Sequence, residues 1–364
     1  MAEQAEEGAR VLIVGAGIMG AVIAHHLARR GAVVTLVDRA GPAAEASGHS
    51  FGWINAAYGN PEAYFRLRFQ SLLEYRRLEA EMDSTLGVKW GGSLLWDPEA
   101  GDLAAYVAGH GAWGYGLRLI GRDAFRALEP EIADPPATAV FAEQEGSLDP
   151  ARATRALLAS AERQGAAPRL GCEVREIRLQ AGRVAGVETD QGTIDAEVVV
   201  LAAGVATQGL AAPLGLALPM SNLPGLLIRT KPVEPLLGRL ALAPGCHVKQ
   251  DPDGSLVAGA DFGGGGEVAD AEAAGAALLE KVKALLPGAS GLVLDEVVLG
   301  LRPMPADGFP AVGFAPGVAG LYVAVMHSGV TLAPAVGRFA AEEILDGARL
   351  DLLAPYRPER FAAR

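Results

Sequence analysis

Short runs of consecutive apolar residues mark the start of the chain. Residues 11–14 and 32–37 are two such runs, and residues 21–30 between them have the composition of a helix that is followed by Gly31. Continuous apolar runs of this length are typical of strands buried on both faces of a parallel sheet. Glycine commonly follows the last turn of a helix. The pattern therefore predicts a β-α-β unit at the N-terminus.

Two later segments repeat this pattern. Residues 198–201 and 321–325 are again continuous apolar runs, and each indicates a buried strand. Residues 151–164 are predicted to form a helix that carries Leu157 and Leu158 among its apolar residues.

The region between these runs has a different pattern. Residues 226–230 and 255–259 are short, turn-bounded segments typical of strands in a mixed sheet, and Asp253-Gly254 favours a hairpin turn between two of them. Residues 263–266 form a tetraglycine segment, and the alanine-rich residues 269–286 are predicted to be a helix. Because 364 residues exceed the usual size of a single core, two closely packed domains are expected.

The small residues after the first apolar run form a recognisable motif, Gly15-Ala16-Gly17-Ile18-Met19-Gly20. Gly15 permits a tight turn, Gly17 lets backbone N–H groups reach a pyrophosphate, and Gly20 lets the helix pack closely on the strand. The N-terminus of the helix then faces the anion. Strand, glycines, helix and second strand in this order predict a dinucleotide site.

An acidic residue completes the motif. Asp38 stands at the end of the second apolar run, where its carboxylate can accept hydrogen bonds from an adenosine ribose. The motif does not separate FAD from NAD, because both carry the ADP half. Asp38 disfavours the 2′-phosphate of NADP, although the adjacent Arg39 leaves that cofactor open.

Residues 45–55, Glu-Ala-Ser-Gly-His-Ser-Phe-Gly-Trp-Ile-Asn, resemble a loop of the FAD-dependent D-amino-acid oxidase, glycine oxidase and sarcosine oxidase family. In that family the loop wraps the pyrophosphate and runs beneath the flavin ring. The small or polar residues that this resemblance assigns to cofactor binding are Ala46, Ser47, Gly48, Ser50 and Gly52. His49 and Asn55 lie on the same loop, and their position does not fix which way they point.

Three further segments match the family in the same order. Residues 147–150 introduce the predicted helix. Residues 171–174 form an extended stretch, and the resemblance implies that Val174 contacts the adenine through its backbone. The run 198–201 then ends in Ala202-Ala203-Gly204, a second glycine-bearing turn that the resemblance places over the dinucleotide.

The C-terminal third carries the most specific match. Residues 300–303 and 307–313 resemble the glycine oxidase pattern, and residues 326–334 follow the last apolar run. The resemblance implies that Gly329, Val330 and Thr331 place backbone N–H groups at the pyrimidine end of the flavin. A helix that begins there aims its positive end at the ring.

The resemblance covers essentially the whole chain and implies an α/β fold: a Rossmann-type FAD-binding domain with an inserted antiparallel-sheet substrate domain. Residues 1–86, 146–212 and 300–364 would form the first domain, and residues 87–145 and 213–299 the second. It also implies an enzyme that oxidises the C–N bond of an amino acid or amine. The hydride would pass to flavin N5 and the imine would hydrolyse to a keto acid.

Three residues are candidates for the chemistry. Arg302 occupies the family position of a guanidinium that holds the substrate carboxylate, for which a planar fork is well suited. Pairing of Arg302 with a buried acid is the alternative. His247 falls where glycine oxidase has a pocket tyrosine and either contacts the substrate or forms the wall. His327, beside the flavin-binding turn, is more often structural in such a position.

The sequence departs from the sarcosine oxidase pattern at two positions. There is no cysteine near residue 300, so FAD is expected to be held non-covalently. Val257 stands where those enzymes have a lysine over the flavin, which leaves an oxidase and a dehydrogenase both open.

Three other functions remain alternatives. One is an FAD-dependent 2-hydroxy-acid dehydrogenase, in which a histidine would take the hydroxyl proton. A flavin subunit of a larger complex is the second, with residues 64–79 as a docking helix or, more often for such spacing, a helix packed on its own core. An NAD-linked dehydrogenase is the weakest, because the C-terminal motifs serve no nicotinamide.

Composition narrows the partners. A net charge of −12 and a pI near 5.1 disfavour nucleic acid and anionic membrane surfaces. The two cysteines, Cys172 and Cys246, have no metal-binding spacing and indicate a reducing cytoplasm. The acidic start is unlike a signal peptide, and no apolar run is long enough for a membrane span. The expected partners are a small amine and an electron acceptor, oxygen or another, and a homo-oligomer is left open.

Overall fold

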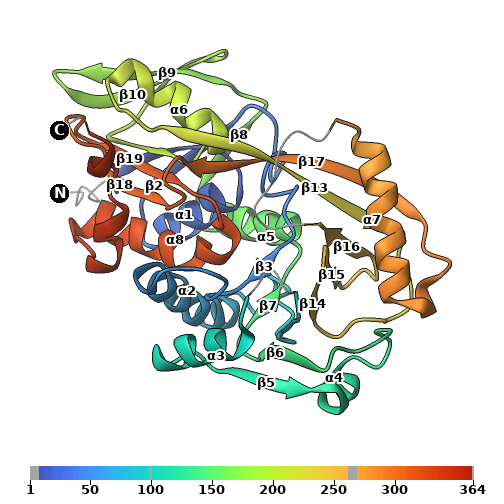
Figure 1. The fold of residues 1–364 in the computed structure, drawn as a ribbon. Helices are drawn as coiled ribbons and strands as arrows, with labels where there is room; N and C mark the ends of the chain where they lie inside the picture. The colour runs from blue at the N-terminus through green and yellow to red at the C-terminus, as the bar shows by residue number, and fades with distance from the viewer. Residues whose placement is uncertain (1–7, 98–100, 261–268, 363–364) are drawn as a thin grey trace.

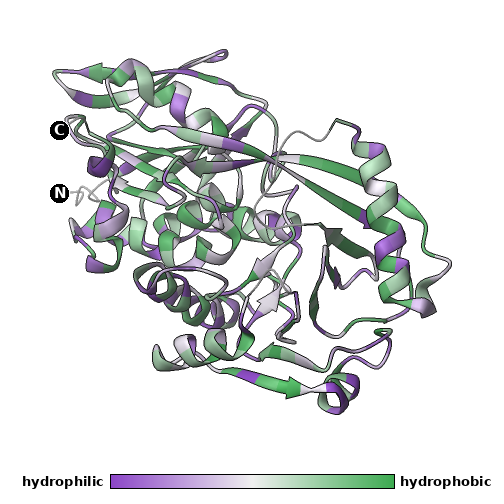
Figure 2. Ribbon diagram, viewed as in Figure 1, coloured by the Kyte–Doolittle hydropathy of each residue, from purple (hydrophilic) through white to green (hydrophobic). Residues whose placement is uncertain are grey.

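The computed structural model describes residues 8–97, 101–260 and 269–362. Two large sheets lie beside one another, with helices around both (Figure 1). Hydrophobic residues follow the strands of these sheets, whereas the outer helices mix hydrophobic and hydrophilic residues (Figure 2). The predicted tetraglycine segment, residues 263–266, lies outside the described residues.

The first sheet has six strands in the order β18-β19-β12-β1-β2-β8. All neighbours pair in parallel except β18 and β19, which are antiparallel. This sheet confirms the N-terminal β-α-β unit and the two later buried strands. Its strands are β1 (Arg10–Val14), β2 (Val33–Asp38), β8 (Ala167–Leu170), β12 (Val198–Leu201), β18 (Ala311–Phe314) and β19 (Leu321–Val325).

Both faces of the six-stranded sheet are covered, which explains its continuous apolar runs. Ile13 faces the core formed with four helices, and its neighbour Leu12 faces the core on the other side, beneath a three-stranded sheet. The helices are α1 (Ile18–Arg29), α2 (Glu62–Glu81), α5 (Pro150–Arg163) and α8 (Gly329–Asp346). The other layer contains β9 (Val174–Gln180), β10 (Arg183–Thr189), β11 (Gly192–Asp195) and α6 (Thr207–Ala211).

The second sheet has eight strands in the order β17-β13-β16-β15-β14-β4-β6-β5. It is antiparallel apart from one parallel pair, β4 with β14. Those two strands come from separate parts of the chain, so no hairpin fixes their relative direction. Its strands are β4 (Ser93–Leu95), β5 (Leu117–Gly121), β6 (Thr138–Ala142), β13 (Met220–Thr230), β14 (Leu240–Ala243), β15 (Cys246–Gln250), β16 (Leu256–Gly259) and β17 (Leu294–Pro305).

One face of the eight-stranded sheet packs on α7 (Ala271–Leu285) and α4 (Arg122–Leu128), and the other faces the first sheet. The predicted hairpin turn at Asp253-Gly254 joins β15 to β16, with Gly254 at φ +87°. The predicted boundary after residue 299 falls inside β17, so one strand belongs to both proposed domains. The remaining short elements are α3 (Leu103–Ala112), β3 (Trp53–Ile54), β7 (Gly146–Ser147) and the 3-10 turns η2 (Gly204–Ala206), η3 (Ala212–Leu214), η4 (Pro287–Ala289), η5 (Asp351–Tyr356) and η6 (Pro358–Phe361).

Helix α2 packs on the molecule's own core. Phe65, Leu72 and Leu78 are buried in it, whereas Leu73 is 50% exposed. Most of the apolar residues considered above for a docking face are therefore already covered. No helix in the described ranges is long and apolar enough to cross a membrane.

A buried histidine makes the stability of this fold sensitive to acid. His25 on α1 is 2% exposed, and its Nδ1 lies 3.1 Å from the Ser160 hydroxyl of α5. Burial, and then the charge of Arg29, lowers the pKa of His25 from 6.5 to about 4. The folded state therefore favours the neutral ring, and stability is lost as pH falls from about 6.5 toward 4.

We expect His25 alone to cost about 2 kcal/mol of stability between about pH 7 and pH 5, which follows from the size of the pKa change. The variant H25Q should remove this part of the pH dependence. Thermal unfolding of both proteins across this range measures it. If the stability of H25Q falls with pH as steeply as that of the wild type, His25 is not the cause of the acid sensitivity.

Candidate functional site

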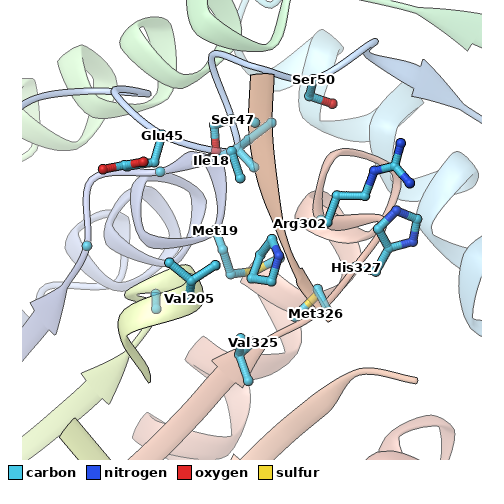
Figure 3. A pocket seen from close by; sticks show the side chains of 18 of the residues that line it. Ile18, Met19, Glu45, Ser47, Ser50, Val205, Arg302, Val325, Met326 and His327 are labelled. Carbon is cyan, nitrogen blue, oxygen red and sulfur yellow. Dashed lines mark hydrogen bonds between the residues drawn. The ribbon is translucent and has the colours of Figure 1, made fainter. Parts of the chain in front are cut away.

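A cavity of about 900 Å³ lies between the two sheets. Its walls come from the carboxyl ends of β1, β2 and β12 and from the inner face of the eight-stranded sheet. The carboxyl edge of a parallel sheet is where open α/β folds bind ligands, because successive loops open outward there. Figure 3 shows part of the cavity, with Glu45 on one side and Arg302 and His327 on the other.

The turn between β1 and α1 forms one end of this cavity. Gly15 has φ +114°, and a β-carbon there would lie 2.4 Å from the carbonyl oxygen of Ala202. A β-carbon at Gly20 would lie 1.9 Å from the carbonyl oxygen of Gly15, so the helix packs directly on the turn. The N-cap of α1 is Gly17, and its first turn carries no acidic residue. The helix therefore presents its positive end to the cavity.

Asp38 lies at the same end and is held by the backbone. Its carboxylate accepts hydrogen bonds from the N–H of Ala16 at 2.7 Å and of Ala40 at 2.8 Å. The neighbouring Arg39 pairs with Glu45 at 2.8 Å on the loop that follows. Part of the carboxylate thus stabilises the glycine turn, and the remaining lone pairs can accept hydrogen bonds from a ribose.

The loop of residues 43–55 crosses the middle of the cavity. Ser47 accepts a hydrogen bond at Oγ from the N–H of Ile18 at 2.9 Å. Gly52 has φ +76°, and a β-carbon there would lie 2.2 Å from the carbonyl oxygen of Leu148. A β-carbon at Gly48 would lie 2.2 Å from the carbonyl oxygen of Ala43. These glycines let the loop fold tightly on itself and on its neighbours.

The start of α8 closes the other end. Ser328 precedes it in a left-handed conformation with φ +58°, and the first turn carries no acidic residue. The Thr331 hydroxyl donates to the carbonyl of Trp53 at 3.1 Å and thereby ties this turn to the loop of residues 43–55. Two helix N-termini, those of α1 and α8, therefore contribute residues to one cavity.

Arg302 reaches the cavity from β17. It pairs in register with Leu223, and its guanidinium lies over Gly225 on the neighbouring strand β13. A β-carbon at Gly225 would be 2.7 Å from a terminal nitrogen of Arg302 and 2.8 Å from Nε. A residue with a side chain at position 225 would therefore displace the guanidinium. Gly300, opposite Gly225, packs against His49: a β-carbon at Gly300 would lie 2.6 Å from the His49 β-carbon and 3.2 Å from its carbonyl oxygen.

His327 lies beside Arg302 (Figure 3). Burial, then the charges of Arg302 and Arg68, lowers the pKa of His327 to about 4. Its Nδ1 is 3.3 Å from the Ser328 hydroxyl, which accepts a hydrogen bond from Arg68 at 2.7 Å. A serine hydroxyl that accepts from Arg68 can still donate to Nδ1 or accept from it, so this contact fits either tautomer of the neutral ring.

The buried carboxyl of Glu145 holds the loop of residues 43–55 in place. Glu145 accepts hydrogen bonds from Trp53 Nε1 at 2.8 Å, the Ser93 hydroxyl at 2.6 Å and the Tyr115 hydroxyl at 2.8 Å. Burial nevertheless raises the pKa of Glu145 to about 7. These contacts join the loop of residues 43–55 to the eight-stranded sheet.

Almost all the residues predicted from the sequence lie on this cavity. Gly20 and Gly48 do not line it and instead support the turns described above. Arg302, His247 and His327 line one cavity together. The predicted cofactor residues that line it are Gly15, Gly17, Ile18, Met19, Asp38, Arg39, Ala46, Ser47, Ser50, Gly52, Val174, Ala202, Ala203, Gly204, Gly329, Val330 and Thr331.

Sequence reasoning missed Arg68, Tyr64 and Gly225, which also line the cavity. Arg68 and Tyr64 stand four positions apart on α2, a spacing that places them on one helix face. An arginine among the buried positions of an amphipathic helix was the available signal. No such signal marks Gly225, because its partner Arg302 is distant in the chain.

These features fit FAD. Two helix N-termini suit its negatively charged groups, and the glycine turn leaves room for a pyrophosphate. The cavity extends from Asp38 to Arg302, which gives space for a dinucleotide and a small substrate. Cys172 lines the cavity near Glu173 and Val174, and Cys246 packs in the core beneath α7. Neither observation opposes the predicted non-covalent attachment.

Comparison with known proteins identifies the family. The model of the family described as FAD dependent oxidoreductase (DAO) matches residues 10–343. The chain therefore belongs to this family and is an FAD-dependent oxidoreductase.

Relatives match over nearly the whole chain. It is 30% identical to a glycine oxidase of Pseudomonas aeruginosa (96% of this chain, 98% of the relative) and 28% identical to a D-amino acid dehydrogenase of Cereibacter sphaeroides (97% and 96%). The crystal structure of glycine oxidase from Geobacillus kaustophilus superposes with a TM-score of 0.86 at 26% identity, covering 97% of this chain and 99% of that one.

These findings confirm the sequence-based predictions of the family, the α/β fold, the FAD cofactor and an enzyme that oxidises amino acids or amines at a C–N bond. The roles of individual residues and the domain boundaries stay predictions. Among the described residues that line the cavity there is no lysine, and Val257 is buried away from it.

The glycine beneath Arg302 gives a direct test of the site. In G225A the new methyl group would displace the guanidinium, so we expect carboxylate ligands to bind about tenfold more weakly, as for the loss of a charged hydrogen bond. Titration of the flavin absorbance with a carboxylate measures this. G109A is the matched control, because a β-carbon there meets no atom within 4 Å. Equal binding by G225A and wild type would contradict the placement of Arg302.

Proposed function

We propose that this oxidoreductase takes a hydride from the α-carbon of an amino acid whose carboxylate is held by Arg302. The observation that carries this proposal is the guanidinium of Arg302, which lies over Gly225 and lines the same cavity as the start of α8. A planar guanidinium offers two parallel N–H groups to one carboxylate. FAD, when bound, supplies the hydride acceptor.

The residues around Arg302 favour an amine over an alcohol. An amine that enters the reaction as the neutral base can lose a hydride without help from a protein base. A 2-hydroxy acid also loses its hydroxyl proton and needs a base to take it. In the proposal Nδ1 of His327 accepts a hydrogen bond from the Ser328 hydroxyl, 3.3 Å away, and Nε2 carries the ring proton. His327 therefore serves in this proposal as a hydrogen-bond donor to the substrate and not as the base.

His247 forms the opposite wall. It lies on β15 opposite Gly259 and is buried while lining the cavity. In the proposal it limits the space beside the substrate. The enzyme acts in the cytoplasm, since Cys172 and Cys246 are both free thiols.

A spectroscopic experiment tests the proposal. Purified holoenzyme, mixed without oxygen with glycine, D- and L-amino acids and N-methyl amino acids, should lose its flavin absorbance with at least one of them. R302M should require roughly a hundredfold more substrate, because a charged bidentate contact is lost. Re-oxidation of the bleached enzyme by air or by a quinone then assigns the acceptor. A flavin that every amine leaves oxidised and a 2-hydroxy acid bleaches would overturn the proposal.

The pH dependence separates the two chemistries further. With an amine, kcat/KM should rise with pH because the substrate ammonium loses its proton. His327, with a pKa near 4, stays neutral above about pH 6 and adds no limb of its own. The profile of H327Q should therefore keep the shape of the wild-type profile at a lower height. If the rise of kcat/KM with pH seen in the wild type disappears in H327Q, His327 acts as a base.

A further inference from the structure

Arg68 is a buried cation whose hydrogen bonds in the described structure go to neutral groups. It is 5% exposed and lines the cavity. Its Nε donates to the carbonyl of Asn55 at 3.1 Å, and its two terminal nitrogens donate to the Asn55 side-chain oxygen at 2.6 Å and to the Ser328 hydroxyl at 2.7 Å. A guanidinium has five N–H groups, so two of them are left for a further acceptor.

Among the described residues no acid forms a hydrogen bond or ion pair with Arg68, although Glu145 lies close enough for the two charges to attract. Buried charges are normally paired, because removing an ion from water is costly. The nearby carboxyl of Glu145 is bonded to Trp53, Ser93 and Tyr115 instead. Among the described residues lining the cavity, the acids are Asp38, Glu45 and Glu173, all near the β1–α1 turn or the start of β9. The two remaining N–H groups of Arg68 are therefore available to a ligand carboxylate.

Tyr64 supplies a second, independent sign of a ligand. It is 4% exposed and lines the cavity, and its hydroxyl is buried with no hydrogen-bond partner in the described structure. The guanidinium of Arg68 lies 5.3 Å from the centre of the Tyr64 ring. A phenol O–H and a guanidinium are both donors, so together they suit an anionic oxygen ligand.

The position of Arg68 relative to Arg302 defines the ligand. Arg68, on α2, donates to the Ser328 hydroxyl, which lies 3.3 Å from His327 Nδ1. Arg302, on β17, lies beside His327 (Figure 3), so the two guanidiniums line the same part of the cavity. We propose that Arg68, with Tyr64 packed beside its guanidinium, forms a second carboxylate site, and that the substrate is a dicarboxylic amino or imino acid held at both ends. This inference rests on the proposed function, in which Arg302 binds the first carboxylate.

Equilibrium binding to the holoenzyme tests the site without turnover. Succinate and glutarate, compared with propionate and butyrate, are titrated while the flavin absorbance is followed. The dicarboxylates should bind roughly tenfold or more tightly than the monocarboxylates, as expected for added hydrogen bonds to a charged group. Y64F should reduce this preference and leave monocarboxylate binding unchanged. R302M should weaken both kinds of ligand.

Y64F decides the test because it deletes only a hydroxyl that makes no hydrogen bond, whereas R68M also loosens Asn55 and Ser328. R66Q is the matched control, since Arg66 lies on α2 in an exposed pair with Glu62. A wild-type preference in both Y64F and R68M would overturn the proposal. So would an R68M protein that loses FAD or shifts its flavin potential while keeping the preference, because Arg68 would then serve the cofactor.

The two proposals fail separately. If no amino acid reduces the flavin but the dicarboxylate preference is present and depends on Tyr64, the second site stands and amine oxidation falls. If monocarboxylic amino acids reduce the flavin as well as aspartate, glutamate or iminodiacetate do, and Y64F does not alter the ratio of their kcat/KM values, the second site falls and amine oxidation stands.

Discussion

The site depends on close backbone approach where two sheets meet. Gly15 contacts the end of β12, Gly52 contacts Leu148, and Gly300 contacts His49. At each of these points a β-carbon would overlap a neighbouring atom, so the segments could not come as near with any other residue. The cavity is therefore bounded largely by main chain, whose N–H groups and carbonyls are fixed by the strands and helices that carry them.

Much of this architecture was accessible from the sequence because it is local. The apolar runs of β1, β2, β12 and β19 signal burial on both faces, and the glycine spacing before α1 specifies a turn of one kind. Elements whose neighbours are adjacent in the chain leave a pattern in their own residues. The parallel pairing of β4 with β14 leaves none, since it joins segments from different insertions.

The side chains that shape the substrate end were harder to predict for the same reason. Whether Arg68 meets Asn55 and Ser328 depends on how α2 rotates against two distant loops, and a periodic pattern reports only which face is buried. The role of Gly225 becomes evident only when the side-chain conformation of Arg302 is known. Family resemblance found Arg302 itself, but the glycine that leaves room for its guanidinium lies on another strand.

The parallel seam between β4 and β14 also affects how the chain reaches this state. Ser93 pairs with Leu240, so the centre of the eight-stranded sheet is completed only when two remote parts of the polypeptide meet. Non-local pairing of this kind slows folding, because the entropy cost of closing a long loop comes before the contacts that offset it. During synthesis β4, β5 and β6 emerge before β14, so the edge of β4 stays unpaired until β14 is made. An unpaired strand edge can pair with another chain and promote aggregation. Synthesis speed and chaperone access, rather than final stability, would then limit the yield of active enzyme.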